Sequence, residues 1–539
     1  MNLGTHLSRA SKPLRNDEDG RGGAVASPPS RTRVDMQLVQ EHTIPSPLSK
    51  NFPLRLLVGV LVVLLAGLMA GWLLPRGPVT TAAAVLTLAV ALMAGLGAGW
   101  LARTAWILLI APVTFMGVFE LARIRVDGPT VDGIDLSGTY GIIALVGGRG
   151  IDALLMLLPL IVGCGWGLVL ARRYGRPVRS GVRGRPLVRF GVLAIATAAV
   201  IVLAAGLIRP ASTPAIIGAD GPVAGSIAEI VDVPVGGHDQ AILLRGASTE
   251  APVLLYLEGG PGGTGIGRIR NSGQDLEQDF VVATWDQRGT GKSNDALEPT
   301  STLTVEQMVK DTLEVTEYLR SRFGEQKIYL VGSSWGTILG TLAVQRSPGL
   351  FHAYVGTGQM VDPFETDQLM YAESLKDAQA RGDDDTVTAL QDLGEPPYEN
   401  TLDYPVAIAS NPKLMNFQHG SDFSASSGYP FSFFVGEYTL LEQLRGMAAI
   451  AETFDVLYPQ LSRTDFRTDV TTLDVPVYIV EGRYEAAGRE TLAREWYDLL
   501  AAPTKDYIRF PDSGHTPPFD EPGQFAKLMS DILTATKAP

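Results

Sequence analysis

The chain has little of what several classes of enzyme depend on. Its only cysteine among 539 residues, Cys164, lies within a long apolar stretch, so an intrachain disulfide is impossible and thiol catalysis is disfavoured. The six histidines and this cysteine show no spacing typical of a metal site. The net charge of −13 lacks the basic excess of a nucleic-acid-binding protein. We therefore expect no metal, no cofactor and no nucleic-acid partner.

Charged residues are scarce between about residues 54 and 208, which accounts for the mean hydropathy of +0.14. Five stretches there approach or reach the ~20 apolar residues that cross a bilayer. They are Leu56–Leu74, Thr80–Leu101, Ala105–Leu121, Ile151–Leu170 and Phe190–Ile208. Buried core helices are the alternative. We predict an all-α transmembrane region over residues 51–210 with five helices, and interpret it as an anchor because no acidic or basic residue lies mid-span.

The basic residues of the short loops indicate how these helices are oriented. Between the fourth and fifth stretches lie Arg172, Arg173, Arg176, Arg179, Arg183 and Arg185. Short loops rich in arginine stay on the cytoplasmic side, so the fifth stretch leads outward to an extracellular domain over residues 211–539. An odd number of spans places residues 1–50, which are polar and rich in Ser, Pro, Gly and Arg, in a disordered cytoplasmic tail.

One segment of the second half carries a candidate nucleophile. Residues 329–331 form a short apolar run leading into Gly332–Gly336, which reads G-x-S-x-G with Ser334 at its centre. A serine on such a strand-to-helix turn projects its hydroxyl out of the backbone, next to the positive end of the helix. Small residues also cluster in tight turns for steric reasons. The pattern therefore needs support from its surroundings.

A glycine-rich loop upstream supplies candidate oxyanion donors. The apolar run Pro252–Leu257 is followed by Glu258–Gly263, in which four glycines surround one proline. Such a loop brings backbone N–H groups close to a ligand, although it is alternatively a plain connection between a strand and a helix. We predict that the backbone N–H groups of Gly260 and Trp335 form an oxyanion hole.

A second loop superficially resembles a phosphate-binding site. The apolar run that ends at Trp285 is followed by Asp286–Ser293, whose last residues read G-K-S. The phosphate-binding pattern G-x-x-x-x-G-K-[ST] requires a glycine where this chain has Asp286. We therefore reject a nucleotide site and expect a turn braced by Asp286 and Arg288 beside the nucleophile.

A catalytic acid and a histidine are expected downstream of the nucleophile, each after a strand. A strand-like run ends in two candidate acids, Glu485, at the expected offset, and its competitor Glu481. Either is alternatively a solvated loop carboxylate. Among the histidines only His515 follows a final predicted strand on a turn. We predict Ser334 as nucleophile, His515 as general base and Glu485 as the acid that orients it.

Three motifs occur here in a combination typical of one known family. Residues from about 227 to 536 resemble the proline iminopeptidase group of α/β-hydrolases, in which G-G-P-G, D-Q-R-G-x-G-x-S and G-x-S-W-G occur together. The matching segments are Gly259–Gly262, Asp286–Ser293 and Gly332–Gly336. The resemblance implies a serine hydrolase with the same three catalytic residues.

The chain also departs from that group. Glu258 precedes the G-G-P-G loop where the group has a histidine, and the acid is a glutamate instead of the usual aspartate. In the proline-specific enzymes a Trp/Glu element of the cap binds the free amino terminus of the substrate. No tryptophan falls between Trp335 and Trp496, so the cap lacks that element in its usual form. Hydrolase chemistry carries over, whereas proline specificity does not.

Strand-like runs in the second half alternate with helical stretches from the third run onward. They are Ile227–Val235, Gln240–Leu244, Val253–Leu257, Phe280–Thr284, Ile328–Val331, Ala353–Gly356, Val477–Val480 and Tyr507–Phe510. The alternation predicts an α/β fold with a mostly parallel sheet covered by helices on both faces. This is the α/β-hydrolase fold that the resemblance implies, and its ligands bind where the candidate catalytic residues fall, at the carboxyl ends of strands.

A mostly helical insertion from about residue 361 to 469 interrupts the alternation and is predicted to form a cap over the nucleophile. Its aromatic residues Phe431, Phe433 and Phe434 either line a substrate pocket or pack in a core. Glu437 is a candidate for binding the amino terminus of a substrate, although a buried carboxylate there requires a partner.

Three functions fit these observations. The first is a membrane-anchored extracellular serine hydrolase, an aminopeptidase that cleaves short peptides through an acyl-enzyme. The second keeps the same triad but acts on carboxylic esters or lipids. The third is a non-catalytic membrane sensor that only binds a ligand, for which a complete triad would have no use.

Overall fold

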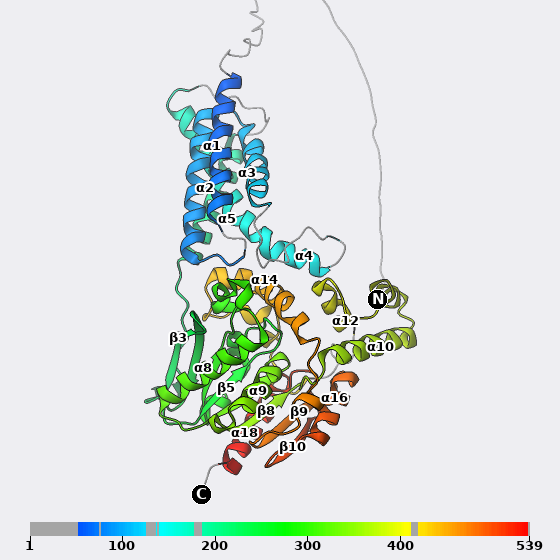
Figure 1. Cartoon of the computed structure of the whole chain (residues 1–539). Coiled ribbons are helices and arrows are strands. Elements are labelled where there is room, and N and C mark those ends of the chain that lie inside the picture. Colours follow the sequence, from blue (N-terminus) through cyan, green and yellow to red (C-terminus); the bar gives the residue numbers. More distant parts are fainter. Residues whose placement is uncertain are drawn as a thin grey trace, which may run out of the picture. The chain divides into compact units, whose positions relative to one another are not determined.

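Figure 1 shows the computed structural model, which describes residues 52–74, 77–124, 136, 139–176, 186–410 and 419–536. The predicted tail, residues 1–50, lies outside the described residues. Apolar helices come first along the chain, and a domain built on a β-sheet follows them.

The first part of the chain is helical. It contains α1 (Phe52–Leu73), α2 (Thr81–Ala102), α3 (Ile107–Arg123), α4 (Thr139–Leu145), the π-helical segment η1 (Val146–Gly150), α5 (Ile151–Arg173) and α6 (Pro186–Leu207). Among the described residues, four segments are long and apolar enough to cross a membrane, namely Pro53–Leu73, Thr81–Ala102, Gly141–Arg173 and Leu187–Leu207. The predicted span Ala105–Leu121 is not among them, because the chain turns at Ala105 and Trp106 and α3 has only 17 residues. The prediction of five membrane spans is therefore wrong, and four candidate spans replace it.

Glycines bring α2 and α5 into direct backbone contact. A Cβ atom built on Gly99 would lie 2.2 Å from the carbonyl oxygen of Cys164, and one built on Gly163 would lie 2.2 Å from a carbonyl oxygen of α2. Gly95 and Gly167 make equivalent approaches, so each helix presents a G-x-x-x-G pair to the other. Small residues at such a contact allow helices to pack closely in lipid, where no hydrophobic effect draws them together.

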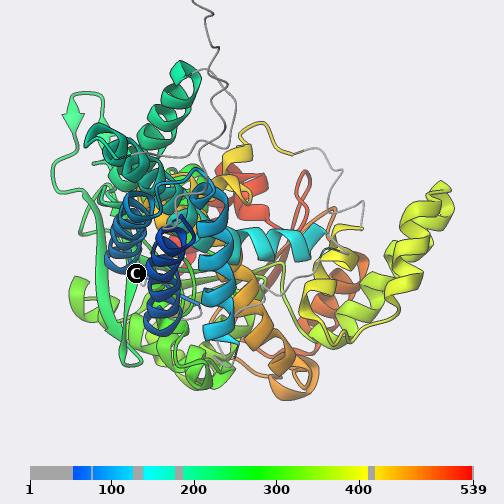
Figure 2. The ribbon, with the colours of Figure 1, turned by 90° about the horizontal axis from the view of Figure 1, so that it is seen from above.

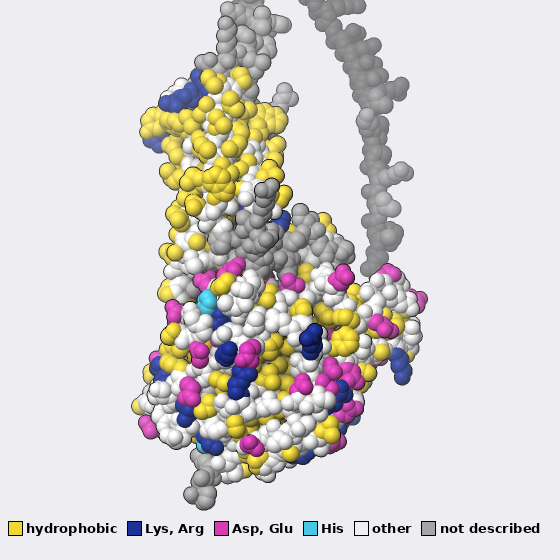
Figure 3. Space-filling model, viewed as in Figure 1, with side chains coloured by type: hydrophobic (Ala, Val, Ile, Leu, Met, Phe, Trp, Pro, Cys, Tyr) yellow, Lys and Arg dark blue, Asp and Glu magenta, His cyan; other side chains and the backbone are white. Residues whose placement is uncertain are grey.

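The outward surface of these helices is apolar. Figures 1 and 2 show α1 beside α2 and α3, and buried side chains of these three helices share one core with those of α5. Trp72, Val113 and Ile195 are exposed on the outside, and hydrophobic side chains dominate the surface of this region in Figure 3. Large exposed apolar surfaces of this kind indicate contact with lipid.

The domain after α6 is built on an eight-stranded sheet of order β10-β9-β8-β7-β5-β6-β4-β3. Its strands are β3 (Ile227–Val235), β4 (His238–Gly246), β5 (Val253–Leu257), β6 (Val281–Trp285), β7 (Ile328–Ser333), β8 (Phe351–Thr357), β9 (Val477–Gly482) and β10 (Lys505–Phe510). β4 pairs antiparallel with β3 and with β6, and all other neighbours are parallel. The predicted strands and the mostly parallel sheet are confirmed. A short hairpin of β1 (Ile217–Gly218) and β2 (Gly221–Pro222) was not predicted.

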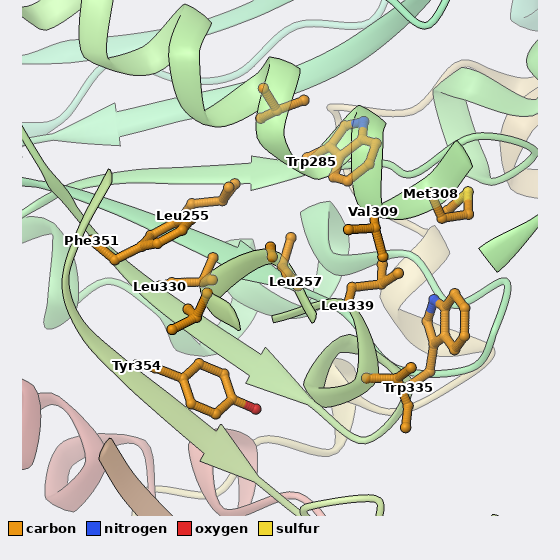
Figure 4. Close-up of a cluster of buried hydrophobic side chains, with 14 of the residues drawn as sticks. Leu255, Leu257, Trp285, Met308, Val309, Leu330, Trp335, Leu339, Phe351 and Tyr354 are labelled. Atoms are coloured by element: carbon orange, nitrogen blue, oxygen red, sulfur yellow. The ribbon is translucent and has the colours of Figure 1, made fainter. Parts of the chain in front are cut away.

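Helices cover both faces of this sheet. They are α7 (Gly265–Ser272), α8 (Val305–Phe323), α9 (Trp335–Arg346), α16 (Ala487–Leu499) and α18 (Pro522–Thr536). Leu255 and Leu257 of β5 pack in one core with side chains of α8, α9 and α16, part of which Figure 4 shows. Leu254 and Tyr256 point to the opposite face and pack with α7 and α18. Because both sets are fully buried, this strand is apolar throughout its length.

The insertion between β8 and β9 is largely helical. It contains α10 (Pro363–Arg381), α11 (Asp384–Leu393), α12 (Tyr404–Ala409), α14 (Leu440–Leu457) and α15 (Phe466–Asp469). At the start of α14, Leu441 is buried in one cluster with Leu203 and Leu207 of α6. Further along α14, the carbonyl oxygen of Ile450 lies 2.6 Å from a Cβ built on Gly262, in the glycine-rich loop. α14 thus connects the apolar helices to the loop beside the nucleophile.

Candidate active site

Ser334 occupies a strained turn between β7 and α9. Its φ and ψ are 50° and −119°, a conformation that side chains rarely adopt. The turn is possible because glycines flank it: a Cβ built on Gly332 would lie 2.4 Å from the carbonyl oxygen of Gly336, and one built on Gly336 would lie 2.2 Å from that of Leu257. This geometry is typical of a nucleophile elbow, which holds the serine hydroxyl clear of the backbone.

His515 and Glu485 are in direct contact. The distance from His515 Nδ1 to Glu485 Oε2 is 2.5 Å. Glu485 is buried, its other carboxylate oxygen accepts the N–H of Ala486 at 2.8 Å, and Arg489 lies 3.7 Å away. Burial by itself raises the pKa of Glu485, but the charge and hydrogen bond of His515 and the charge of Arg489 hold the pKa below its ordinary value. An ionised carboxylate at Nδ1 leaves Nε2 free to accept a proton.

The competing acid, Glu481, faces another group. One of its oxygens accepts the backbone N–H of Gln359 at 2.9 Å, and the side chain is fully buried. Burial, followed by the negative charge of Glu485, raises the pKa of Glu481 well above its ordinary value. Of the two acids considered from the sequence, the structure brings only Glu485 to the histidine.

Ser334 and His515 both lie beside the turn that follows β8, although no hydrogen bond joins the two side chains among the described residues. The backbone N–H of Ser334 donates to the carbonyl oxygen of Thr357 at 2.9 Å. The next residue, Gly358, has a φ of 57°, and a Cβ built on it would lie 2.7 Å from Cε1 of the His515 ring. The hydroxyl of Ser334 lies 3.9 Å from the sulfur of Met360. The serine, the imidazole and the carboxylate therefore converge at one edge of the sheet.

The glycine-rich loop lies against the nucleophile. A Cβ built on Gly259 would lie 3.1 Å from Cβ of Ser334, so a larger residue would displace the serine or the loop. Gly260 is exposed with a φ of 124°, and its N–H donates no hydrogen bond within the described part of the chain. Trp335 is the first residue of α9, where backbone N–H groups have no partner within the helix. Both N–H groups are available to a ligand.

Glu258 has a structural partner in this loop. Its Oε1 accepts the N–H of Gly259 at 2.9 Å and Nη1 of Arg268 at 2.9 Å, and both side chains are buried. The guanidinium of Arg268 also lies 3.8 Å from the centre of the Phe519 ring. A buried ion pair thus holds the loop at the position where the sequence departs from the family motif.

Gln287 is a supporting residue that the sequence interpretation did not single out. Its Oε1 accepts the indole N–H of Trp335 at 2.9 Å, and its Nε2 donates to the carbonyl oxygen of Glu258 at 3.0 Å. It therefore ties the helix after the nucleophile to the glycine-rich loop. Gln287 lies in the D-Q-R-G motif between Asp286 and Arg288, which were both considered as braces. This position in the motif could have indicated its structural role.

The neighbours of Gln287 brace the same turn. Arg288 and Asp311 form a fully buried ion pair with an Nε to Oδ2 distance of 2.7 Å. Asp286 accepts the backbone N–H of Lys292 at 2.9 Å and the hydroxyl of Tyr438 at 3.1 Å. Burial raises the pKa of Asp286 to about 7, against the lowering effect of these hydrogen bonds. The turn is tied to the insertion by Tyr438.

The three candidate substrate-binding residues of the cap lie in different surroundings. Phe433 is buried in a cluster with Ile266 and Tyr438, which is core packing. Phe434 is 63% exposed. Glu437 is buried, and its Oε1 accepts from Nε of Arg270 at 3.0 Å. Its carboxylate is therefore already engaged by a cation.

Comparison with known proteins identifies the family to which this chain belongs. A model of the alpha/beta hydrolase fold family matches residues 252–522. The chain belongs to the α/β-hydrolase family. Probable aminopeptidase YbaC of Bacillus subtilis (strain 168) is 28% identical over 309 residues, which cover 57% of this chain and 96% of that protein. The α/β-hydrolase fold and the relationship to the proline iminopeptidase group, predicted from the sequence, are confirmed.

Two solved α/β-hydrolase structures are similar at a lower level. The proline iminopeptidase-related protein from Thermus thermophilus is 21% identical with a TM-score of 0.39, over 57% of this chain and 98% of that one. Proline iminopeptidase of Mycobacterium smegmatis is 18% identical with a TM-score of 0.41, over 57% and 98% of the two chains. The family assignment rests on the family model, and the relationship to aminopeptidases rests on the Bacillus protein.

Proposed function

We propose that the protein is a serine hydrolase that works through an acyl-enzyme. The observation that carries the proposal is the 2.5 Å contact between His515 Nδ1 and Glu485 Oε2, beside Gly358, whose neighbour Thr357 accepts the backbone N–H of Ser334. Ser334 Oγ attacks the substrate carbonyl while Nε2 of His515 takes its proton. The N–H groups of Gly260 and Trp335 stabilise the oxyanion that forms.

The same groups complete the reaction. The tetrahedral intermediate collapses, and His515 gives its proton to the departing amine or alcohol. Water then attacks the acyl-enzyme as His515 removes a proton from it, and that proton returns to Ser334 as the acid product leaves. Glu485 keeps the imidazole in the required tautomer and stabilises its charged form.

The substrate that the relatives favour is a short peptide with a free amino terminus. This follows from the similarity to probable aminopeptidase YbaC, which spans almost the whole of that protein. A carboxylic ester is the second candidate, and a specific observation favours it. Glu437, the residue considered for binding the amino terminus of a substrate, is buried and already paired with Arg270 at 3.0 Å.

We further propose that the hydrolase domain lies outside the cell. Arginines gather at one end of the helical region: Arg176 stacks on Trp100 with its guanidinium 4.3 Å from the ring centre, and the charges of Arg55 and Arg176 act on Arg103. Basic residues at a membrane face indicate the cytoplasmic side. α6 begins after the arginine-rich segment and leads directly into the hydrolase domain.

The proposal is tested with the full-length protein in lipid nanodiscs. We expect Ser334→Ala to lower turnover by at least about 10³-fold without changing the thermal midpoint by more than a few degrees, since only an oxygen is lost. Assays with aminoacyl amides, peptidyl amides and short-chain esters assign the substrate class. Unchanged turnover in Ser334→Ala would refute the nucleophile, and saturable binding without any turnover by the parent protein would favour a non-catalytic sensor.

A further inference from the structure

Two large apolar side chains of the insertion are exposed close together. Phe431 and Phe434 are 61% and 63% exposed, three positions apart on one short loop. Exposed aromatic residues of this size usually mark a contact surface when they occur in pairs. Neither ring is packed in the protein core, so their exposure requires an explanation.

The loop is held in a conformation that keeps these two rings outside. Phe433, between them, is buried against Tyr429 with ring centres 5.5 Å apart. Nε2 of Gln443, in the first turn of α14, donates to the carbonyl oxygens of Val435 and Tyr438 at 3.2 and 3.0 Å. The neighbours of the exposed rings are thus fixed to the rest of the insertion.

The same loop is attached to the end of a candidate membrane span. The N–H of Ser212 donates to the carbonyl oxygen of Gly436 at 2.9 Å, and Ser212 follows the last residue of α6, Leu207, by five positions. Five residues reach at most about 18 Å. A Cβ built on Gly206, in the last turn of α6, would lie 2.5 Å from Leu440 of α14. The loop therefore lies near the level at which α6 leaves the apolar layer.

We propose that Phe431 and Phe434 insert into the boundary between headgroups and acyl chains of the bilayer that α6 crosses. Aromatic and apolar side chains beside a membrane segment are favoured at this depth. The first turn of α14 already packs among the apolar helices through Leu440, Leu441 and Leu444. The two rings extend this apolar contact from protein to lipid. The inference rests on α6 crossing a membrane and is independent of the catalytic proposal.

A membrane-seated loop has a consequence for the insertion as a whole. Tyr438, seven positions after Phe431, contacts Asp286 of the turn that braces the nucleophile. The loop in lipid would then be connected through Tyr438 to the turn beside the nucleophile. The insertion would then be a cap whose outer surface contacts lipid.

Site-directed spin labelling of the full-length protein tests this proposal. Phe431→Cys, Phe434→Cys and the control Leu499→Cys each place one nitroxide at an exposed apolar position, the control at the end of α16. Cys164 is buried, so the unmodified protein serves as the labelling blank. In nanodiscs of phosphatidylcholine and phosphatidylglycerol, relaxation by dissolved oxygen and by a water-soluble nickel chelate is compared at each position.

Oxygen is enriched in lipid, and the nickel chelate is excluded from it. We expect oxygen to dominate at positions 431 and 434 and the chelate to dominate at 499, with at least a severalfold difference in their ratio. Dominance of the chelate at both phenylalanine positions overturns the proposal. Protection from both reagents also overturns it, because protein and not lipid would then cover the loop.

Discussion

Two glycines with similar steric surroundings have different roles in the helical region and in the hydrolase domain. A Cβ built on Gly99 of α2 would lie 2.2 Å from a carbonyl oxygen of α5, and one built on Gly336 of α9 would lie 2.2 Å from a carbonyl oxygen of β5. In the helical region the missing side chain allows two apolar helices to touch. In the hydrolase domain it allows a helix to begin beside a strand, with Ser334 on the turn between them.

The two regions also differ in the polar groups that they bury. The hydrolase domain buries charged pairs such as Arg288 with Asp311 and Arg245 with Glu277 at distances of 2.7 Å. The cluster that holds α1, α2, α3 and α5 together is made of apolar and small side chains, and an ion pair between Arg123 of α3 and Asp152 of α5 at 3.5 Å lies beside it. The difference teaches that backbone contact provides stability in the helices, whereas fixed polar geometry provides the site. Substitutions in the two regions should therefore fail in different ways.

The largest effect is expected within the polar site. Glu485→Gln removes the charge that orients His515 and should lower kcat/KM by about 10³ to 10⁴-fold. Glu481→Gln is the matched control, because it changes a neighbouring buried acid that accepts the N–H of Gln359 and does not contact the imidazole. We expect the control to retain turnover within about tenfold, as for loss of one hydrogen-bonding preference. The reverse ranking in steady-state kinetics would exchange the roles of the two acids.

Gly336→Ala tests whether the domain glycine serves the site. The added methyl group meets the carbonyl oxygen of Leu257, so the elbow must move away from β5. A displacement of about 1 Å at a reacting atom costs about 10²-fold in rate. We expect that loss in kcat, measured beside the thermal midpoint of the same preparation. Full activity would show that the elbow tolerates the shift. It would then be wrong that this glycine serves the catalytic site.

Gly99→Ala tests the other half of the comparison. Its methyl group meets the carbonyl oxygen of Cys164 and should lower stability by about 1–3 kcal/mol, the usual effect of overpacking. Gly97→Ala is the control on the same helix, because a Cβ there would meet only Val62, at 3.9 Å. Thermal inactivation in nanodiscs should separate the two variants, while both keep their rate per folded molecule at low temperature. Equal midpoints would argue against tight backbone packing.

The smallest effect concerns pH. The folded-state pKa of Glu481 is raised above its unfolded value of about 4.3, so its stabilising contribution is present below that pH and is lost as pH rises toward the folded pKa. Glu481→Gln removes this loss. We expect the stability of the variant relative to the parent to increase with pH above about 5, by up to about 1.4 kcal/mol per unit. A difference that is constant with pH would mean that Glu481 is ionised in the fold.

The sequence predicted the sheet well because its strands are continuously apolar and are separated by helical stretches. All eight strands and the order nucleophile, acid, histidine could be read in this way. The choice of Glu485 over Glu481 was harder, since both lie after the same strand and only the path of residues 511–515 decides which one meets the imidazole. That path depends on packing between distant segments, which a local pattern does not contain.

The surroundings of the cap residues and the number of membrane spans were less predictable, because they also depend on contacts and helix ends that composition does not determine. Phe433 and Phe434 are neighbours of the same type, yet one is buried and the other is exposed. Glu437 gained a partner, Arg270, from a helix 167 positions earlier in the chain. The third apolar stretch was counted as a span from composition, but its helix starts late, after a turn at residues 105–106. Composition indicates burial, and it does not fix where a helix begins.

The packing of α14 has a consequence for separating the hydrolase domain from the apolar helices by proteolysis. Cleavage of the chain between Leu207 and Ile216 would cut the covalent tether, but Leu441 would remain buried among side chains of α2, α5 and α6. If the cleaved domain separated from the helices, the apolar surface around Leu441 would become exposed to water. The fragment would then tend to self-associate. Proteolysis of this connection is therefore a poor way to obtain a soluble hydrolase domain.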